Sequence, residues 1–185
     1  MKEENSQLKE NLKKIATKAN DNEQYSRRNN IRIFGLQEDK SKSTSESVVN
    51  FLKHELDVDI SHSEIDKAHP IGKSQDGKPP PLIVKFSNHR SKEKVLSRRR
   101  SLKGKRIFIT EDLTKQNYQL LQAAKKHSSV SSCWSHNGKI LAKCENPPRT
   151  IHITDLFILE SIAETDVDDE QFHMPDESPH QVRIA

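Results

Sequence analysis

The apolar residues of this chain change their spacing at Asn29, and the change limits what each part can fold into. Before this point, four apolar residues follow a 4-3-4 spacing: Leu8, Leu12, Ile15 and Ala19. Such a spacing is the stripe of a heptad repeat, and Lys and Glu flank it here. Residues 1–26 are therefore predicted to form a coiled-coil segment. The alternative is a solvated helix that caps the next domain, because so short a helix is marginal without a partner.

Beyond Asn29 the pattern is that of alternating strands and helices. Strands are predicted at 31–36, 65–69, 82–86 and 106–110, and helices at 44–56 and 89–101. A Pro-rich and Gly-containing loop over 72–81 separates the second strand from the third. The order β-α-β-β-α-β matches the split βαβ, ferredoxin-like arrangement, which is also the layout of the RNA-recognition motif (RRM). We therefore expect an RRM-like domain over residues 27–111.

The rest of the chain is predicted to hold a small α/β domain, residues 112–163, followed by an acidic tail. Thr114 suits the N-cap of a helix that ends near His127. Asn137-Gly138, the strongest short hairpin signal, lies between strands predicted at 132–135 and 139–143. A strand at 151–153 and a helix at 155–163 follow. Residues 164–185 lack periodicity and are expected to be disordered, so the predicted fold class is α+β.

Charge is distributed unevenly along the chain. Residues 27–110 carry nineteen Lys and Arg against ten acids, whereas residues 154–185 carry one against nine. Hydrophobic residues make up only 31% of the chain, so a compact core covers only part of its length. A basic body and an acidic tail predict a polyanionic partner.

Nothing in the sequence indicates secretion or membrane insertion. The first ten residues are too charged for a signal peptide, and no run of 18 apolar residues exists. Two cysteines, Cys133 and Cys144, do not make a disulfide framework. We expect a soluble cytoplasmic protein with no membrane partner, with the nucleus as a further location.

The strongest candidate binding segment is residues 90–106, which hold nine cations and one acid, Glu93. The cations are Arg90, Lys92, Lys94, Arg98, Arg99, Arg100, Lys103, Lys105 and Arg106. Cations at the end of a helix suit its dipole, but that role does not explain nine of them. We predict phosphate binding here, the alternatives being a solvated face or a localisation signal.

Strand alternation predicts the character of the sheet surface. On the first strand, Ile31 and Ile33 are expected in the core, with Arg32 and Phe34 facing outward. Arg32 then takes the position where an RRM usually has a stacking aromatic residue. On the third strand, Ile83 and Lys85 are expected outside. Outward positions that are mainly cationic and aliphatic favour sequence-tolerant binding, with Arg32 stacking through its guanidinium plane; the alternative is that Arg32 and Lys85 are ordinary surface charges.

Five segments in order resemble one protein lineage. They are QYSRRNNIRIFGL (24–36), IDKAHPIGK (65–73), PPPLIVKF (79–86), VLSRRRSLKGKRIFITEDLT (95–114) and WSHNGKI (134–140). Over about residues 20–155 the chain resembles the RNA-binding, first-open-reading-frame protein of LINE-type non-LTR retrotransposons. It is also similar to the few-polyhedra protein of baculoviruses.

The first resemblance implies a coiled coil that trimerises the chain, and two domains that together grip RNA or single-stranded DNA with nucleic acid chaperone activity. That family also uses cations at the junction of coiled coil and RRM-like domain, where this chain has Arg27 and Arg28; charges at the end of a helix are an equal explanation. Trp134, with Lys139 and Lys143 nearby, is a further candidate, although a lone Trp is more often a core residue. The second resemblance keeps open a protein–protein assembly factor.

Metal and catalytic sites are not expected. Cys133, His136, Cys144 and His152 are zinc-binding residue types, but their C-x2-H-x7-C-x7-H spacing fits no ligand pattern. Gly72-Lys73-Ser74 lacks the upstream glycine of a phosphate-binding loop, and no nucleophile–base pair or paired carboxylates occur. We therefore predict a binding protein that has no cofactor and is not an enzyme.

Overall fold

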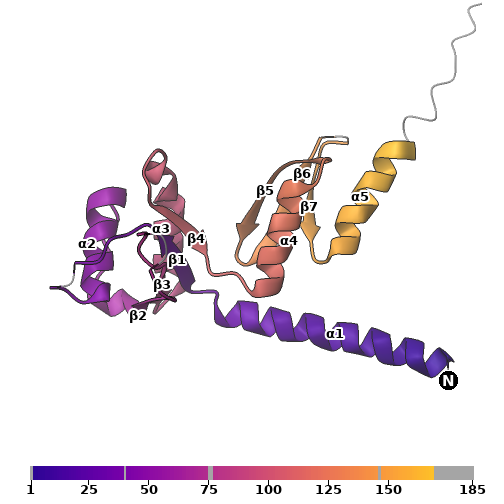
Figure 1. The fold of residues 1–185 in the computed structure, drawn as a ribbon, viewed down its shortest axis with the longest axis horizontal. Coiled ribbons are helices and arrows are strands. Elements are labelled where there is room, and N and C mark those ends of the chain that lie inside the picture. Colours follow the sequence, from indigo (N-terminus) through magenta and orange to yellow (C-terminus); the bar gives the residue numbers. More distant parts are fainter. Residues whose placement is uncertain (1, 40, 75–76, 146, 169–185) are drawn as a thin grey trace, which may run out of the picture. The chain divides into compact units, whose positions relative to one another are not determined.

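The computed structural model describes residues 2–39, 41–74, 77–145 and 147–168. Its contacts divide the chain into two compact units. The first unit comprises residues 1–119 and 135–139, and the second comprises residues 120–134 and 140–185. Helices and antiparallel sheets occur together, so the α+β class is confirmed (Figure 1). Among the described residues, no helix is long and apolar enough to cross a membrane.

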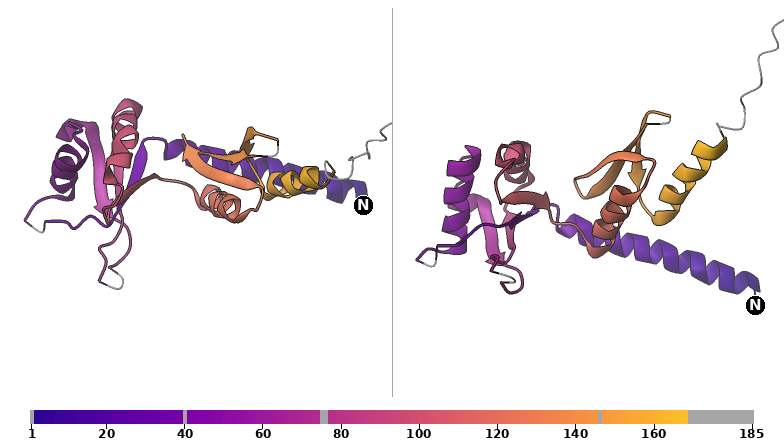
Figure 2. Two further views of the ribbon diagram at one scale, coloured as in Figure 1. Left: turned by 90° about the horizontal axis from the view of Figure 1, so that it is seen from above. Right: turned by 45° about the horizontal axis from the view of Figure 1, so that its top comes forward.

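The first unit begins with α1 (Lys2–Ser26), one unbroken helix (Figure 2). The elements β1, α2, β2, β3, α3 and β4 follow in that order. Their bounds are β1 (Asn30–Phe34), α2 (Thr44–Leu56), β2 (Ile65–Pro70), β3 (Leu82–Phe86), α3 (His89–Arg98) and β4 (Phe108–Glu111). Two short 3-10 helices, η1 (His62–Glu64) and η2 (Arg99–Leu102), precede β2 and follow α3. The four strands form one sheet in the order β2-β3-β1-β4, with antiparallel neighbours.

Side-chain alternation sets the two faces of this sheet. Ile31 and Ile33 of β1 are completely buried, whereas Arg32 and Phe34 are partly exposed, as the sequence predicts. The same alternation holds along β3. The inward residues form one core with those of α2 and α3: Val48, Phe51, Leu52 and Leu56 of α2 and Val95 of α3. Burial of apolar surface against these helices therefore sets the register of the sheet.

The start of α2 shows how local sequence sets an element. The Ser43 side-chain oxygen accepts a hydrogen bond from the Glu46 backbone N–H at 3.2 Å, and the Glu46 carboxylate accepts one from the Ser43 N–H at 3.0 Å. This reciprocal capping box satisfies two donors that the first helical turn would otherwise leave unpaired. Val49 of α2 is only partly buried and packs against the edge of this core.

The rest of the chain contains two helices and three strands, and the three strands form a second sheet. The elements are α4 (Lys115–Lys126), β5 (Val130–His136), β6 (Lys139–Cys144), β7 (Arg149–Ile153) and α5 (Leu156–Asp168). The sheet has the order β5-β6-β7. Asn137 and Gly138 both have positive φ, 51° and 78°, which is the backbone that a two-residue hairpin turn requires.

The second unit has its own small core, and its last helix is longer than expected. Buried residues come from α4, β6, β7 and α5: Leu120, Ala124, Ile140, Ala142, Cys144, Ile153, Leu159 and Ile162. Helix α5 continues to Asp168, so residues 164–168 of the expected disordered tail are helical. Residues 169–185 of that tail lie outside the described residues.

Candidate nucleic-acid interface

The densest group of cations lies where α3 ends and the chain turns into β4. We call Arg98, Arg99, Arg100, Lys103, Lys105 and Arg106 the basic turn. The predicted single helix over 89–101 is divided: α3 stops at Arg98, and η2 continues to Leu102. Leu102 is buried in the core, and Gly104 has φ +87°. Because Leu102 holds the turn against the core, the cations around it face solvent; Arg99 is half-buried and the others are exposed.

Among the residues that the structure describes, one cation of the basic turn has an acidic partner. Lys105 forms an ion pair with Glu55 of α2. Within the described part of the chain, no ion pair involves Arg98, Arg99, Arg100, Lys103 or Arg106. Five guanidinium and ammonium groups therefore remain available to an external anion within nine residues of sequence.

Lys92 belongs to the same basic segment of sequence, but the structure contradicts a phosphate-binding role for it. Its side chain is buried, and its Nζ lies 2.8 Å from Oε1 of Glu111 on β4. The other Glu111 oxygen accepts a hydrogen bond from the Gly138 N–H at 3.3 Å. Burial alone raises the pKa of Glu111, but the hydrogen bond and charge of Lys92, with smaller contributions from Ser135 and Gly138, lower it below its ordinary value.

The outward cations of the sheet, Arg32 and Lys85, both have acidic partners. The Arg32 Nε donates to Oδ1 of Asp112 at 2.7 Å, and the Lys85 Nζ lies 2.7 Å from Oδ2 of Asp66. Lys85 and Asp66 are each about half exposed, so water screens their attraction and the pair stays open to exchange. Arg32 is more restricted, because Asp112 is buried.

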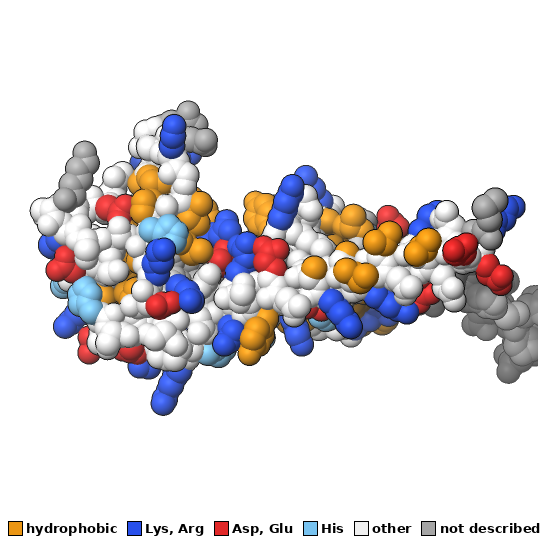
Figure 3. Space-filling view, turned by 90° about the horizontal axis from the view of Figure 1, so that it is seen from below, with side chains coloured by type: hydrophobic (Ala, Val, Ile, Leu, Met, Phe, Trp, Pro, Cys, Tyr) orange, Lys and Arg blue, Asp and Glu red, His pale blue; other side chains and the backbone are white. Residues whose placement is uncertain are grey.

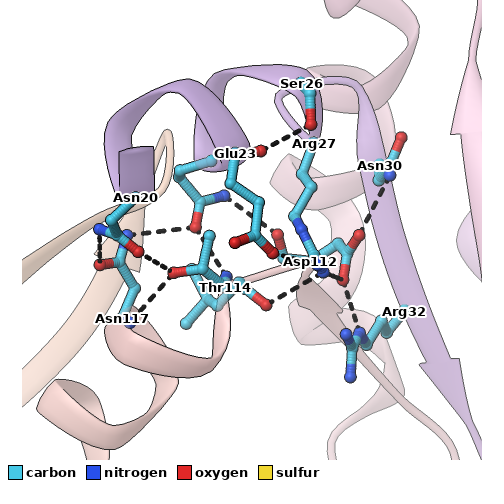
Figure 4. A network of polar contacts seen from close by, with 11 residues as sticks. Asn20, Glu23, Ser26, Arg27, Asn30, Arg32, Asp112, Thr114 and Asn117 are labelled. Carbon is cyan, nitrogen blue, oxygen red and sulfur yellow. Dashed lines mark hydrogen bonds and ion pairs between the residues drawn. The ribbon is translucent and has the colours of Figure 1, made fainter. Parts of the chain in front are cut away.

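Asp112 is the centre of a polar network that joins the end of α1 to β1 and to the segment after β4 (Figure 4). Its carboxylate accepts hydrogen bonds from Arg27 Nη1 at 3.1 Å, Asn30 Nδ2 at 3.0 Å and Arg32 Nε. Arg27 also pairs with Glu23 one turn earlier in α1. A buried carboxylate is stable when it is paired and hydrogen-bonded in this way. Arg27 is thus a structural residue at the junction, and its charge is neutralised.

Neighbouring residues extend the same network to α4. The Asn117 N–H donates to Oγ1 of Thr114 at 3.1 Å, which confirms Thr114 as the N-cap of α4. The Thr114 hydroxyl donates in turn to Oδ1 of Asn20 at 2.7 Å. Gln24 of α1 accepts from the Thr114 N–H and donates to the Asp112 carbonyl oxygen. Arg28 makes none of these contacts; its guanidinium lies 4.0 Å from the centre of the Tyr25 ring, and the side chain is exposed.

The strands β5 and β6 contribute the remaining predicted residues. Trp134 on β5 keeps 37% of its surface exposed, so it is not the buried core residue that a single Trp would most often be. Lys139 and Lys143, at the two ends of β6, are exposed. No group of three or more His, Cys, Asp or Glu residues in the described ranges could hold a metal ion.

Two features of the site are absent from the sequence prediction. One is Asp112, which lies 80 residues from Arg32 and gives no local signal. The other is Phe108, which lies opposite Phe34 on the neighbouring strand with the two rings stacked. Alternation around the buried Ile109 could have placed Phe108 on the outer face.

No protein-family model matches the chain, and no curated protein is similar enough to count as a match.

Proposed function

We propose that this protein binds RNA and single-stranded DNA in a sequence-tolerant way, through an RRM-like domain and without enzymatic activity. The observation that carries the proposal is the basic turn, in which five cations have no ion-pair partner within the described residues. Like charges repel at this density, and a polyanion that neutralises them removes the repulsion. The element order and the strand order β2-β3-β1-β4 support the RRM-like assignment.

Ion pairing also indicates which cations contact phosphate most readily. Arg27, Arg32 and Lys85 each have a carboxylate partner, so a phosphate at any of them must compete with it. The other five cations of the basic turn have no ion-pair partner among the described residues, so a phosphate there meets no such competition. We therefore place the main phosphate contacts on the basic turn, with Arg28, Lys139 and Lys143 as further exposed cations. The resemblance to first-open-reading-frame proteins of LINE-type retrotransposons adds nucleic acid chaperone activity to this proposal, with a cytoplasmic and nuclear location.

Fluorescence anisotropy with a labelled single strand, measured over a salt series, tests the proposal. Each phosphate contact to a single strand contributes about 0.7 to the slope of log affinity against log salt. Replacing Arg98, Arg99 and Arg100 together by Ala should therefore reduce the steepness of the slope by about 2.

A variant with the same loss of charge elsewhere is the control. Lys13 and Lys14 lie on α1 away from its apolar row, and Lys53 is exposed on α2. Their combined replacement by Ala should leave most of the slope in place. The proposal is wrong if the wild-type protein does not bind, or if both triple variants change the slope equally.

One observation favours a second candidate, an assembly factor that acts through α1. Three large apolar residues of its predicted stripe, Leu8, Leu12 and Ile15, are 57–64% exposed, and hydrophobic side chains lie in a row along this helix in Figure 3. An uncovered heptad stripe requires a second helix, from another copy of the chain or from a partner. A homo-oligomer, a trimer by the resemblance, is compatible with either function.

Two measurements on the purified protein separate the candidates. Co-purified nucleic acid raises the ratio of absorbance at 260 nm to that at 280 nm, which the binding function predicts. An assembly factor should give nucleic-acid-free protein that forms a stable complex with an acidic protein partner. Light scattering measures the number of chains in the particle in either case.

A further inference from the structure

An exposed stack of two phenylalanine rings lies on the outer face of the four-stranded sheet. Phe34 on β1 and Phe108 on β4 are cross-strand partners. Their ring centroids are 4.5 Å apart, and the ring planes differ by only 6°. Phe108 keeps 54% of its surface exposed, whereas Ile33 and Ile109, their neighbours along the strands, are buried on the opposite face. The pair is therefore held in place by the sheet while one side of it faces solvent.

This geometry is that of a stack that can be extended. Two rings in parallel contact present a flat outer surface, and a further planar ring added to it buries apolar area without disturbing the pair. An exposed Phe is costly to leave in water, since full burial of such a side chain contributes about 1.5–3 kcal/mol. A nucleobase meets the requirement, because every base has a flat π-face.

The ring pair lies beside the basic turn, and the cations of this turn indicate which kind of ligand stacks on the rings. Phe108 follows Arg106 by two residues. On β1, Gly35 follows Phe34 with φ +80°, and a Cβ atom there would lie 2.2 Å from the Arg106 carbonyl oxygen. The end of β1 thus touches the end of the basic turn. A ligand on Phe108 has exposed cations within reach, so a planar ring attached to phosphates fits better than an aliphatic group or an uncharged peptide.

We propose that the exposed face of Phe108 stacks one base of a single strand whose phosphates follow the basic turn. The inference rests on the proposed function and adds the contact that reads an unpaired base. Double-stranded nucleic acid does not fit, because its bases are already stacked on one another. The site also differs from the Arg32 position, where an RRM usually has its aromatic residue: Arg32 is tied to Asp112, and the ring pair lies one outward position further along β1.

The experiment compares Phe108→Leu with Phe108→Trp in full-length protein, using a single-stranded oligonucleotide and an abasic strand of equal length. Leu keeps an apolar side chain but removes the ring, and Trp restores a ring. Stacking contributes about 1–3 kcal/mol per base, so Phe108→Leu should weaken binding of the base-containing strand about 5- to 150-fold. Because stacking releases no counterions, the salt slope of Phe108→Leu should equal that of the wild-type protein. Phe108→Trp should restore affinity, and the abasic strand should bind all three proteins equally.

The outcomes separate this inference from the function on which it rests. If wild-type protein binds neither strand, the proposed function itself is wrong. If wild-type protein binds with a steep salt slope and Phe108→Leu binds each strand as tightly as the wild type does, only the stacking site is overturned. An equal loss on the abasic strand, or a flatter slope, would also overturn it. A lower mass of Phe108→Leu in light scattering, with unchanged affinity, would instead make the ring pair a contact between copies. Phe34→Leu, which removes the supporting ring, should weaken binding of the base-containing strand and leave binding of the abasic strand unchanged.

Discussion

The buried ion pair between Lys92 and Glu111 allows a sharp test of how this domain is stabilised. The two side chains are 2% and 3% exposed, and Nζ and Oε1 are 2.8 Å apart. Replacing Lys92 by Met keeps most of the length of the side chain and removes its charge. Glu111 is then left in the interior without its cation. Loss of one partner of a buried pair typically costs about 3–5 kcal/mol, so we expect the free energy of unfolding to fall by that amount at pH 7.

The double variant Lys92→Met/Glu111→Leu is the control, because it removes both charges and fills the space with apolar atoms. Replacing a buried ion pair in this way is often neutral or stabilising. The double variant should therefore be at least as stable as Lys92→Met, and within about 2 kcal/mol of the wild-type protein. Urea denaturation followed by circular dichroism measures all three free energies.

The dependence on pH gives an independent check of the same pair. The pKa of Glu111 is lowered in the folded wild-type protein, so its stabilising contribution is present above its unfolded pKa and is lost as pH falls through the folded value. In Lys92→Met, burial acts without the cation and raises that pKa, so the variant gains stability on acidification. The gap between the two proteins should therefore begin to narrow as pH falls through the raised Glu111 pKa of the variant, and narrow further as pH falls through the lowered Glu111 pKa of the wild-type protein. A cost under 1 kcal/mol at pH 7, or a gap that does not depend on pH, would refute the reasoning.

Three further predictions concern separate parts of the chain. Thr114→Ala removes the N-cap of α4 and its bond to Asn20, and should lower the free energy of unfolding by about 1–2 kcal/mol; Thr114→Ser should recover most of the loss, and an unchanged denaturation midpoint would contradict the cap. Gly35→Ala should destabilise the domain by more than about 1 kcal/mol, because φ is +80° and the added methyl meets the Arg106 carbonyl oxygen; an equal melting temperature would show that the backbone there can move. Leu12→Asp should reduce the particle to a single chain in light scattering, while Lys13→Asp, which lies outside the apolar stripe of α1, should not.

The elements of the fold could largely be predicted from local patterns. The strand Leu82–Phe86 and the helix Thr44–Leu56 have the predicted bounds, because alternation and a capping box are written in adjacent residues. Predictions were less accurate where tertiary contacts end an element. The strand predicted over 106–110 starts at Phe108, and Arg106 before it lies against Gly35 at the end of β1.

The candidate site shows more clearly which properties follow from local sequence and which depend on tertiary contacts. The sequence alone determined that residues 90–106 are densely basic, and that Arg32 and Lys85 face outward from the sheet. Only the tertiary structure decided which of these charges remain available. Lys92 pairs with Glu111, Lys105 with Glu55 and Arg32 with Asp112, and the partners are 19, 50 and 80 residues apart in the chain. An ion pair depends on distance in space, and a run of like charges does not show which of its members the folded chain will neutralise.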